Sequence, residues 1–313
     1  MNSKYIIIAI VSLAFFCNRP TKAEQKNVEL LFNEARAAYT LINQIRNNPS
    51  AYSEKMGVNL DTVKKRNSLI WNEKLSKAAQ NKAKDLAARD YWGHFTPEGK
   101  SPAYFAVREG YYLPLKWPNL DKINYIESIS GGGSRSGYEH IKNLIFDNGA
   151  PHSSPKANHR KHLLGMNEFW AKHIHIGIGF AYNPRSKYRG YLVVFTGIPG
   201  VPYSIISGKL FAPNKTKTNK AIENIWIGAI DSKKNKFWTQ TAIPIGKNRI
   251  TYQIRVPQNS RIVIRYFKQY KNGEFSRGYY SKNGTVHKKD RADVLKVGTE
   301  NISNIDLNFK NNR

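Results

Sequence analysis

The sequence predicts an α+β protein in which a mixed helix-and-strand domain is followed by a smaller all-β domain. Apolar residues recur at helical spacing in several segments between Val28 and Ile145, and strand-like runs follow in 173–200. After about Gly200 the helical period is missing, and short β-branched and aromatic runs alternate with turn residues. The 313 residues are enough for two domains with separate cores.

Four helices and a strand pair are expected in the first domain. The helices are predicted from Val28 to Asn48, from the cap-like Asn72 to about Trp92, from Ser101 to Gly110, and around Tyr138–Ile145 after a flexible turn at Gly131–Ser134. Pro102 suits the first turn of the third helix, where no backbone N–H is needed. The segments His173–Pro184 and Gly190–Gly200 are predicted to pair as strands around a polar turn.

The second domain is predicted to be a β-sandwich. Its strand-like runs are "ENIWIGAID", "KFWTQTAIPIG", "NRITYQIRVPQN", "SRIVIRYFKQY" and "NISNIDLNFK". Their length and spacing are typical of two packed antiparallel sheets, of an immunoglobulin-like or prealbumin-like kind. The composition change places the boundary so that the first domain covers 24–202 and the β-domain covers 203–313.

Residues 1–23 have the features of a secretory signal peptide. Lys4 precedes the apolar run Tyr5–Phe16, and the polar stretch that follows ends in Thr21-Lys22-Ala23. We therefore expect a secreted, extracellular or cell-envelope protein. A lipid anchor on Cys17, the single cysteine, is the alternative, but the residues before it lack the usual leucine and small residue. Cleavage after Ala23 would leave a protein without disulfides.

The chain is strongly basic, with 50 Lys and Arg against 22 Asp and Glu and a formal net charge of +28. Residues 24–200 carry 25 basic and 15 acidic side chains, whereas 201–313 carry 22 and 7. A field of this sign attracts polyanions such as lipopolysaccharide, anionic lipid or anionic glycan. The charges are scattered along the chain, so a merely solubilising surface is the alternative. No nucleic-acid module is recognised, and nucleic acid is not an expected partner.

Four polar residues of the first domain are candidates for a divalent metal site: His94, Glu127, Asp147 and His159. Imidazoles bind such ions, and carboxylates either bind them too or hold the imidazole tautomers. The spacing between the four is unlike that of a local zinc motif, so spacing alone is a weak signal. His173 and His175 alternate in a strand-like segment, and an exposed sheet face is the interpretation we adopt for them.

A family resemblance connects these residues. Four stretches resemble, in order, the motifs of one superfamily: "LIWNEKLSKAAQNKAKDLAARDYWGHFTPEGKSP" (69–102), "YIESI" (125–129), "NHRKHLLG" (158–165) and "HIGIG" (175–179). This is the CAP superfamily, also called the SCP domain, which includes the cysteine-rich secretory proteins, antigen 5 and pathogenesis-related 1. The resemblance implies a three-layer α-β-α sandwich with a cleft. It also implies a His–Glu–Glu–His tetrad that takes up zinc or another divalent ion, carried here by His94, Glu127, Asp147 and His159.

The sequence departs from that pattern in two places. In "NLIFDNG" Leu144 stands where the family has tryptophan and Asp147 stands where it has glutamate, so the acid is one methylene shorter. Glu139 and His140, earlier on the same predicted helix, are the alternatives if Asp147 does not reach the site. The asparagine of the family's Gly-Glu-Asn motif is replaced by Ser128.

Two functions remain open from the sequence. The first is a secreted protein whose cleft binds a lipid or peptide beside a metal ion, most readily zinc, and whose basic β-domain docks on an anionic surface. The alternative is a metal-dependent extracellular hydrolase or peptidase in which Glu127 activates a metal-bound water. Family resemblance does not decide catalysis, and we place binding before hydrolysis.

Overall fold

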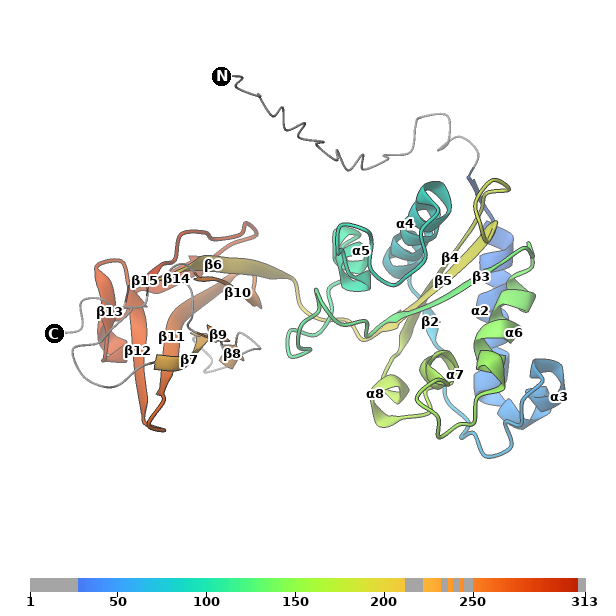
Figure 1. The fold of residues 1–313 in the computed structure, drawn as a ribbon, viewed down its shortest axis with the longest axis horizontal. Helices are drawn as coiled ribbons and strands as arrows, with labels where there is room; N and C mark the ends of the chain where they lie inside the picture. The colour runs from blue at the N-terminus through green and yellow to red at the C-terminus, as the bar shows by residue number, and fades with distance from the viewer. Residues whose placement is uncertain (1–27, 212–221, 232–235, 239–242, 245–249, 309–313) are drawn as a thin grey trace, which may run out of the picture.

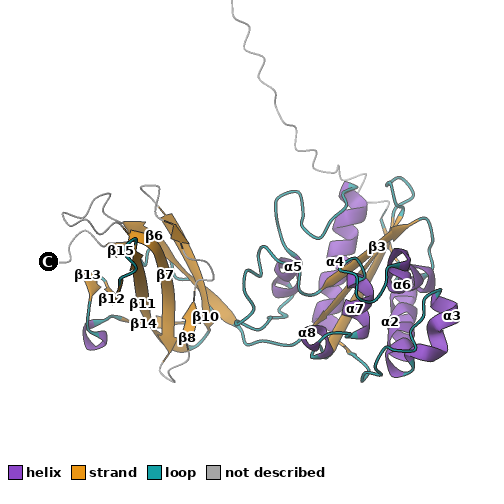
Figure 2. Cartoon of the chain, turned by 60° about the horizontal axis from the view of Figure 1, so that its bottom comes forward, coloured by secondary structure: helices purple, strands orange, loops and turns teal. Residues whose placement is uncertain are grey.

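The computed structural model describes residues 28–211, 222–231, 236–238, 243–244 and 250–308. The predicted signal peptide and Cys17 lie outside the described residues. The α+β fold class is confirmed: an α-β-α sandwich is followed by two packed β-sheets (Figures 1 and 2). The two parts are joined where strand β6 (Tyr203–Phe211) leaves the first part, and Tyr112 packs edge-on against Tyr203 there.

The central sheet of the first part has five strands. They are β1 (Glu29–Leu30), β2 (Ile70–Trp71), β3 (Glu127–Gly132), β4 (His175–Tyr182) and β5 (Gly190–Gly197). The order is β1-β4-β5-β3, and β2 lies parallel beside β4 with Ile70 opposite His175. β4 and β5 form the predicted strand pair, in antiparallel register from His175–Gly197 to Tyr182–Gly190. Both strands are buried almost throughout because helices cover both faces of the sheet.

One face of the sheet is covered by α2 (Phe32–Asn47), α3 (Ser53–Met56) with the short 3₁₀ turn Pro49–Tyr52, α6 (Gly137–Phe146) and α7 (Asn158–Leu164). Their buried aliphatic side chains, among them Ile42, Ile45 and Ile145, meet Ile176 and Ile178 of β4. Strand β1 takes the first residues of the range predicted to be helical, so α2 begins later than expected, at Phe32.

The other face is covered by α4 (Glu73–Arg89) and α5 (Pro102–Arg108), close to the predicted ranges. Asn72 caps α4 by accepting a hydrogen bond from the backbone N–H of Leu75 at 3.1 Å. Gly177 lets α4 approach β4 at backbone contact: a Cβ there would lie 2.1 Å from the backbone nitrogen of Ser76. A short helix, α8 (Glu168–Ala171), precedes β4.

The predicted flexible turn at Gly131–Ser134 is wrong in its first half. Gly131 and Gly132 are the last residues of β3, opposite Tyr191 and Gly190 of β5. Trp92 packs over Gly131 so closely that a Cβ would lie 2.6 Å from its ring. A side chain here would displace the Trp92 ring, so Gly131 accommodates an aromatic contact rather than a flexible turn.

The second part contains two sheets. The strands besides β6 are β7 (Ile222–Asp231), β8 (Lys236–Trp238), β9 (Ile243–Pro244), β10 (Ile250–Pro257), β11 (Ser260–Tyr270), β12 (Phe275–Ser281), β13 (Gly284–Val286), β14 (Val294–Val297) and β15 (Leu307–Asn308), with a 3₁₀ turn at Lys289–Arg291. One sheet has the order β10-β6-β15, and the other has the order β13-β12-β11-β7-β8, with β14 paired to β11 and β9 paired to β7. Alternation along β11 turns Ile262, Ile264 and Tyr266 into the shared core.

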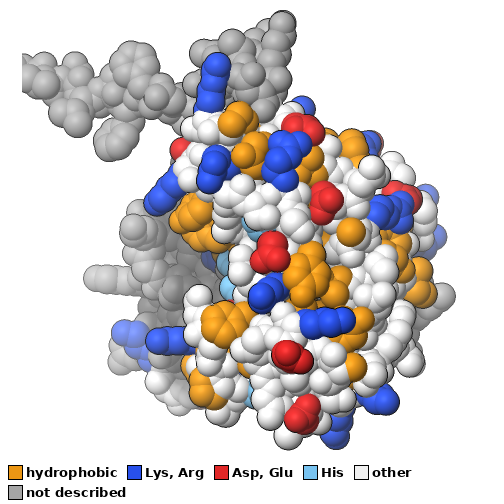
Figure 3. Space-filling model, turned by 90° about the vertical axis from the view of Figure 1, so that its right-hand side faces the viewer, with side chains coloured by type: hydrophobic (Ala, Val, Ile, Leu, Met, Phe, Trp, Pro, Cys, Tyr) orange, Lys and Arg blue, Asp and Glu red, His pale blue; other side chains and the backbone are white. Residues whose placement is uncertain are grey.

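Lys and Arg side chains do not form a continuous patch on the described surface that Figure 3 shows. On the face that carries α2, α3 and α6, they are interspersed with acidic and hydrophobic side chains (Figure 3). The described helices are each too short or too polar to span a lipid bilayer.

Candidate functional site

A cavity of about 250 Å³ lies where the loop after α4 meets β3, α7 and α8. Its lining residues are His94, Asn124, Tyr125, Glu127, Ser128, Asn158, His159, His162 and Trp170. Three of the four predicted metal-site residues, His94, Glu127 and His159, therefore share one cavity although 65 residues separate the first from the last. Asp147, the fourth, lies behind His159.

His94 is paired with Glu127. Its Nδ1 lies 2.7 Å from Oε2 of Glu127, which begins strand β3 and whose side chain is completely buried. The side-chain oxygen of Asn124 accepts the backbone N–H of Glu127 at 2.9 Å, and its amide nitrogen donates to the Glu127 carbonyl at 2.8 Å. This clamp fixes the start of β3, and with it the carboxylate that orients the His94 ring.

Lys82 holds the loop that carries His94, a role that the sequence analysis missed. Its buried Nζ donates to the carbonyl oxygens of Gly93 and His94, each at 3.1 Å, and to the hydroxyl of Tyr91 at 3.0 Å. Burial lowers the pKa of Lys82, while the nearby charge of Glu127 acts in the opposite direction. The signal was present in the sequence, because Lys82 lies on the inward-facing row of α4 with Leu75, Ala79 and Leu86.

His159 is paired with Asp147 in the same manner. Its Nδ1 lies 2.9 Å from Oδ1 of Asp147, while Oδ2 accepts the backbone N–H groups of His159 at 3.0 Å and of Arg160 at 3.3 Å. Asp147 follows the last residue of α6 in the left-handed region, with φ of 50°, and this turn brings its short side chain to the start of α7. The missing methylene is therefore compensated by the backbone.

The two alternatives to Asp147 do not line the cavity. Glu139 is exposed on α6. His140 is buried, with Nδ1 2.9 Å from Oγ of Ser130 and Nε2 3.1 Å from the Ser134 carbonyl oxygen. Both of its ring nitrogens are engaged in holding the end of β3.

Arg160 is a second structural residue that the sequence analysis did not identify. The side chain is fully buried and donates to the carbonyl oxygens of Ile145 at 2.6 Å, Phe146 at 2.7 Å and Ala150 at 2.8 Å. These carbonyls belong to the turn on either side of Asp147. Arg160 thus fixes the turn that presents Asp147 to His159.

A chain of buried polar groups leads from the cavity into the core. Ser128 Oγ lies 2.7 Å from His162 Nδ1, and Thr196 Oγ1 lies 2.6 Å from both His162 Nε2 and His173 Nδ1. Burial lowers the pKa of His162 well below 6.5, and nearby His173 adds to this effect. Burial and the charge of Arg46 lower the pKa of His173 to about 3, so both rings are neutral at pH 7.

The exposed-face interpretation of His173 and His175 is wrong for His173. The side chain precedes β4, is only 3% exposed and stacks on Trp117 with 5.5 Å between ring centroids. His175 is half-buried, and its Nδ1 lies 3.1 Å from the hydroxyl of Tyr111. Neither residue lines the cavity.

The donor set of the cavity consists of two imidazoles backed by two carboxylates. Within the described ranges, no three His, Cys, Asp or Glu side chains are grouped around one point as a metal ion would require. Each Nδ1 is turned to a carboxylate, which leaves the Nε2 of His94 and of His159 as the donor atoms. Carboxylate–histidine pairs of this kind orient metal ligands in proteins. An ion in this cavity would be bound through these two Nε2 atoms, and its other positions would be filled from outside the chain.

Comparison with known proteins identifies the first part of the chain. The model of the CAP family, described as the cysteine-rich secretory protein family, matches residues 32–197, which is more than half of the chain. The chain belongs to this family. The match includes both carboxylate–histidine pairs and ends at the last residue of β5.

This CAP protein is also similar to solved structures at low identity. An outer surface protein from Borrelia burgdorferi is 16% identical, with 55% of this chain and 98% of that chain covered and a TM-score of 0.35. A gamma-CGTase from alkalophilic Bacillus clarkii is 8% identical, with 44% of this chain and 27% of that chain covered and a TM-score of 0.23. A comparison with curated proteins finds no match.

Proposed function

We propose that this CAP protein is a secreted or envelope-associated binding protein. The cavity lined by His94 and His159, called the cleft from here on, would hold a divalent metal ion and an external ligand together. The observation that carries the proposal is the pair of carboxylate–histidine contacts at one cavity, at 2.7 and 2.9 Å. A bound ion would supply a Lewis-acidic position for a carboxylate, phosphate or carbonyl oxygen of the ligand. Zinc suits imidazole donors.

The residues around the two histidines have different roles in the proposed binding. Glu127 and Asp147 accept from Nδ1–H and so keep each Nε2 lone pair available. Tyr125 and Trp170 form an aromatic wall, in which the Trp170 indole N–H donates to the Tyr125 carbonyl oxygen at 3.3 Å. A cavity of about 250 Å³ is smaller than a typical site for a whole small molecule. It therefore suits a lipid head group or one end of a peptide.

Hydrolysis is the weaker alternative because of the position of Glu127. A general base must reach the water that it activates. Oε2 of Glu127 is already engaged with His94, and Oε1 is buried without a hydrogen-bond partner in the described structure. The Glu127 side chain would have to leave His94 to act on a water, so its geometry favours an orienting role.

The β-domain supports the second half of the proposal, docking on an anionic surface. Arg261 and Lys296 lie opposite each other on β11 and β14, and Arg277 lies on the same outer face on β12; all three are exposed. No carboxylate lies on that face at positions 224–230 of β7 or among the described residues of β11, β12 and β14. Lipopolysaccharide, anionic lipid and anionic glycan all present the complementary charge.

Zinc titration of the purified protein tests the cleft. We expect one zinc ion per chain, measured by calorimetry and by elemental analysis after dialysis. His94→Ala and His159→Ala should each abolish binding, whereas His287→Ala removes an exposed histidine of the β-domain and should leave binding unchanged. Zinc binding that survives in both cleft variants contradicts the proposed site.

Sedimentation with lipopolysaccharide or with vesicles containing anionic lipid tests the docking face. Changing Arg261, Arg277 and Lys296 together to Gln removes three exposed positive charges without touching the core. We expect the bound fraction to fall at least about fivefold at roughly 0.15 M salt. Undiminished binding by this variant excludes the face as the docking surface.

A further inference from the structure

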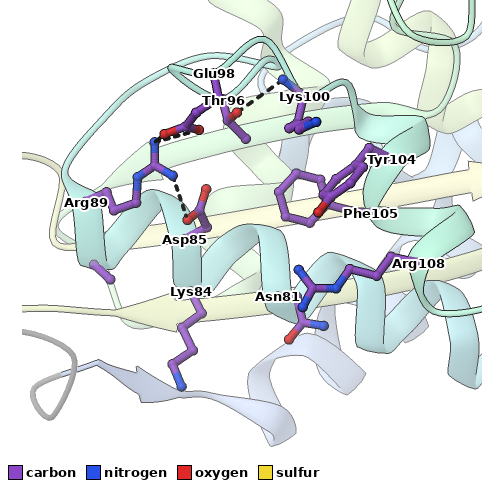
Figure 4. A pocket seen from close by; sticks show the side chains of 11 residues that line it. Asn81, Lys84, Asp85, Arg89, Thr96, Glu98, Lys100, Tyr104, Phe105 and Arg108 are labelled. Carbon is purple, nitrogen blue, oxygen red and sulfur yellow. Dashed lines mark hydrogen bonds and ion pairs between the residues drawn. The ribbon is translucent and has the colours of Figure 1, made fainter. Parts of the chain in front are cut away.

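A second hollow, separate from the cleft, lies between α4, the segment 96–100 and α5 (Figure 4). Its volume is about 530 Å³, and it shares no lining residue with the cleft. The lining residues are Asn81, Lys84, Asp85, Ala88, Arg89, Thr96, Glu98, Lys100, Tyr104, Phe105 and Arg108. Its size is within the usual range of small-molecule sites, and we call it the α4–α5 groove.

Both acidic side chains that line the groove are engaged by one arginine. Arg89 lies 2.8 Å from Glu98 and 3.5 Å from Asp85, and these contacts gather all three side chains at one end of the groove (Figure 4). Hydrogen bonds from Thr96 and Arg89 lower the pKa of Glu98, so this exposed carboxylate stays charged. An anionic ligand at the other end of the groove therefore does not compete with these two carboxylates for the remaining cations.

Three cations of the groove have no carboxylate partner within the part of the chain that the structure describes. Lys84, Lys100 and Arg108 form no ion pair among the described residues, and they come from α4, the loop and α5 respectively. Arg108 lies beside Asn81, and Lys100 lies at the opposite wall (Figure 4). Cations that approach one hollow from separate elements favour an anionic group within it.

The groove also offers an aromatic face and an acceptor. Tyr104 is 39% exposed, and Nζ of Lys100 lies 5.2 Å from the centre of its ring. Asn81 also lines the groove, and its amide nitrogen donates to Glu109 at 2.8 Å, so its side-chain oxygen can still accept a hydrogen bond at this edge of the groove. A ligand here therefore meets positive charge, a ring face and a neutral hydrogen-bond acceptor together.

We propose that the α4–α5 groove binds a carboxylated saccharide unit. The carboxylate would lie between Lys100 and Arg108, the apolar face of the sugar ring would pack on Tyr104, and a hydroxyl would donate to Asn81. Most of the lining side chains are charged or polar, beside Ala88, Tyr104 and Phe105, so the groove suits an amphipathic sugar unit better than an acyl chain. Inorganic phosphate would use the cations but neither the ring face nor the acceptor.

Calorimetry of the full chain with a hyaluronan tetrasaccharide, in which glucuronic acid alternates with N-acetylglucosamine, tests the proposal. Chitotetraose, a neutral tetramer of N-acetylglucosamine, is the matched ligand without carboxylates. We expect binding of hyaluronan only, weakened about tenfold by Lys100→Gln, Arg108→Gln or Tyr104→Ala. Lys55→Gln is the matched control, since Lys55 also lies over a tyrosine ring, at 5.4 Å from Tyr52, but on α3 of the other helical layer.

The outcomes distinguish the sources of binding. Equal binding of chitotetraose, or no effect of Lys100→Gln and Arg108→Gln, overturns the proposal. A loss as large in Lys55→Gln as in Lys100→Gln also overturns it, because attraction would then follow net charge alone. Displacement of the tetrasaccharide by equimolar inorganic phosphate would reduce the groove to a simple anion site and reject the saccharide. Thermal unfolding of each variant confirms that these exposed substitutions leave the fold intact.

Discussion

Lowering the pH from 7 to 5 should destabilise the first domain through the buried histidines, of which His173 gives the clearest magnitude. Its pKa is 6.5 when unfolded and about 3 when folded, because burial and Arg46 disfavour the charged ring. Between these values the unfolded chain binds a proton that the folded chain does not, so stability falls as pH falls. Each pH unit is worth about 1.4 kcal/mol, which gives about 2 kcal/mol at pH 5 from His173 alone.

His173→Asn isolates this effect. An asparagine amide can retain a hydrogen bond to Thr196, which the ring makes at 2.6 Å, but it cannot take up a proton. Urea unfolding at pH 7 and at pH 5, followed by tryptophan fluorescence, should show that the variant loses about 2 kcal/mol less than the wild type. Trp117 stacks on His173 and reports on this region.

The control is His287→Asn, which removes an exposed histidine and should follow the wild type at both pH values. His162 acts in the same direction as His173, so His173→Asn retains part of the acid sensitivity. An equal loss of stability in the wild type and in His173→Asn between pH 7 and pH 5 would refute the reasoning. The buried ring would then not be neutral in the folded state.

Two further substitutions test the packing behind the cleft. Gly177→Ala places a Cβ 2.1 Å from the backbone nitrogen of Ser76 and should lower the free energy of unfolding in urea by at least about 3 kcal/mol. Gly298→Ala is the control, because a Cβ there has no atom within 4 Å, and it should change this free energy by less than about 0.5 kcal/mol. Lys82→Met removes the donor to the Gly93 and His94 carbonyls and should both lower stability, by about 3 kcal/mol, and weaken zinc binding at least about tenfold. Zinc affinity equal to that of the wild type in Lys82→Met would show that the loop holds His94 without the lysine.

The sequence predicted those features that depend on neighbouring residues. Apolar periodicity placed α4 and α6 to within a few residues, with Asn72 marking the start of α4, whereas Pro102 and Gly110 marked the two ends of α5. The short strands β1 and β2 escaped prediction. Each has two residues and is a strand only because it pairs with β4, so no pattern in the neighbouring residues predicts it.

The candidate site was predicted from motif order, and its division of roles was not. Family resemblance selected His94, Glu127, Asp147 and His159, but spacing could not show that each carboxylate faces the Nδ1 of one histidine. That arrangement depends on where β3 and the α6–α7 turn lie in the folded chain. The left-handed backbone of Asp147 explains how a shorter acid serves at this position.

By itself the sequence determined the fold class, because periodicity, capping and composition are local properties of the chain, and the order of its family motifs selected the polar residues. Only the tertiary structure decided which of those polar groups meet. The Ser128–His162–Thr196–His173 chain joins four segments, and Lys82 reaches the His94 loop from an inward row of α4. A buried charge or imidazole is stable only with partners that satisfy it, and folding brings those partners from distant parts of the sequence.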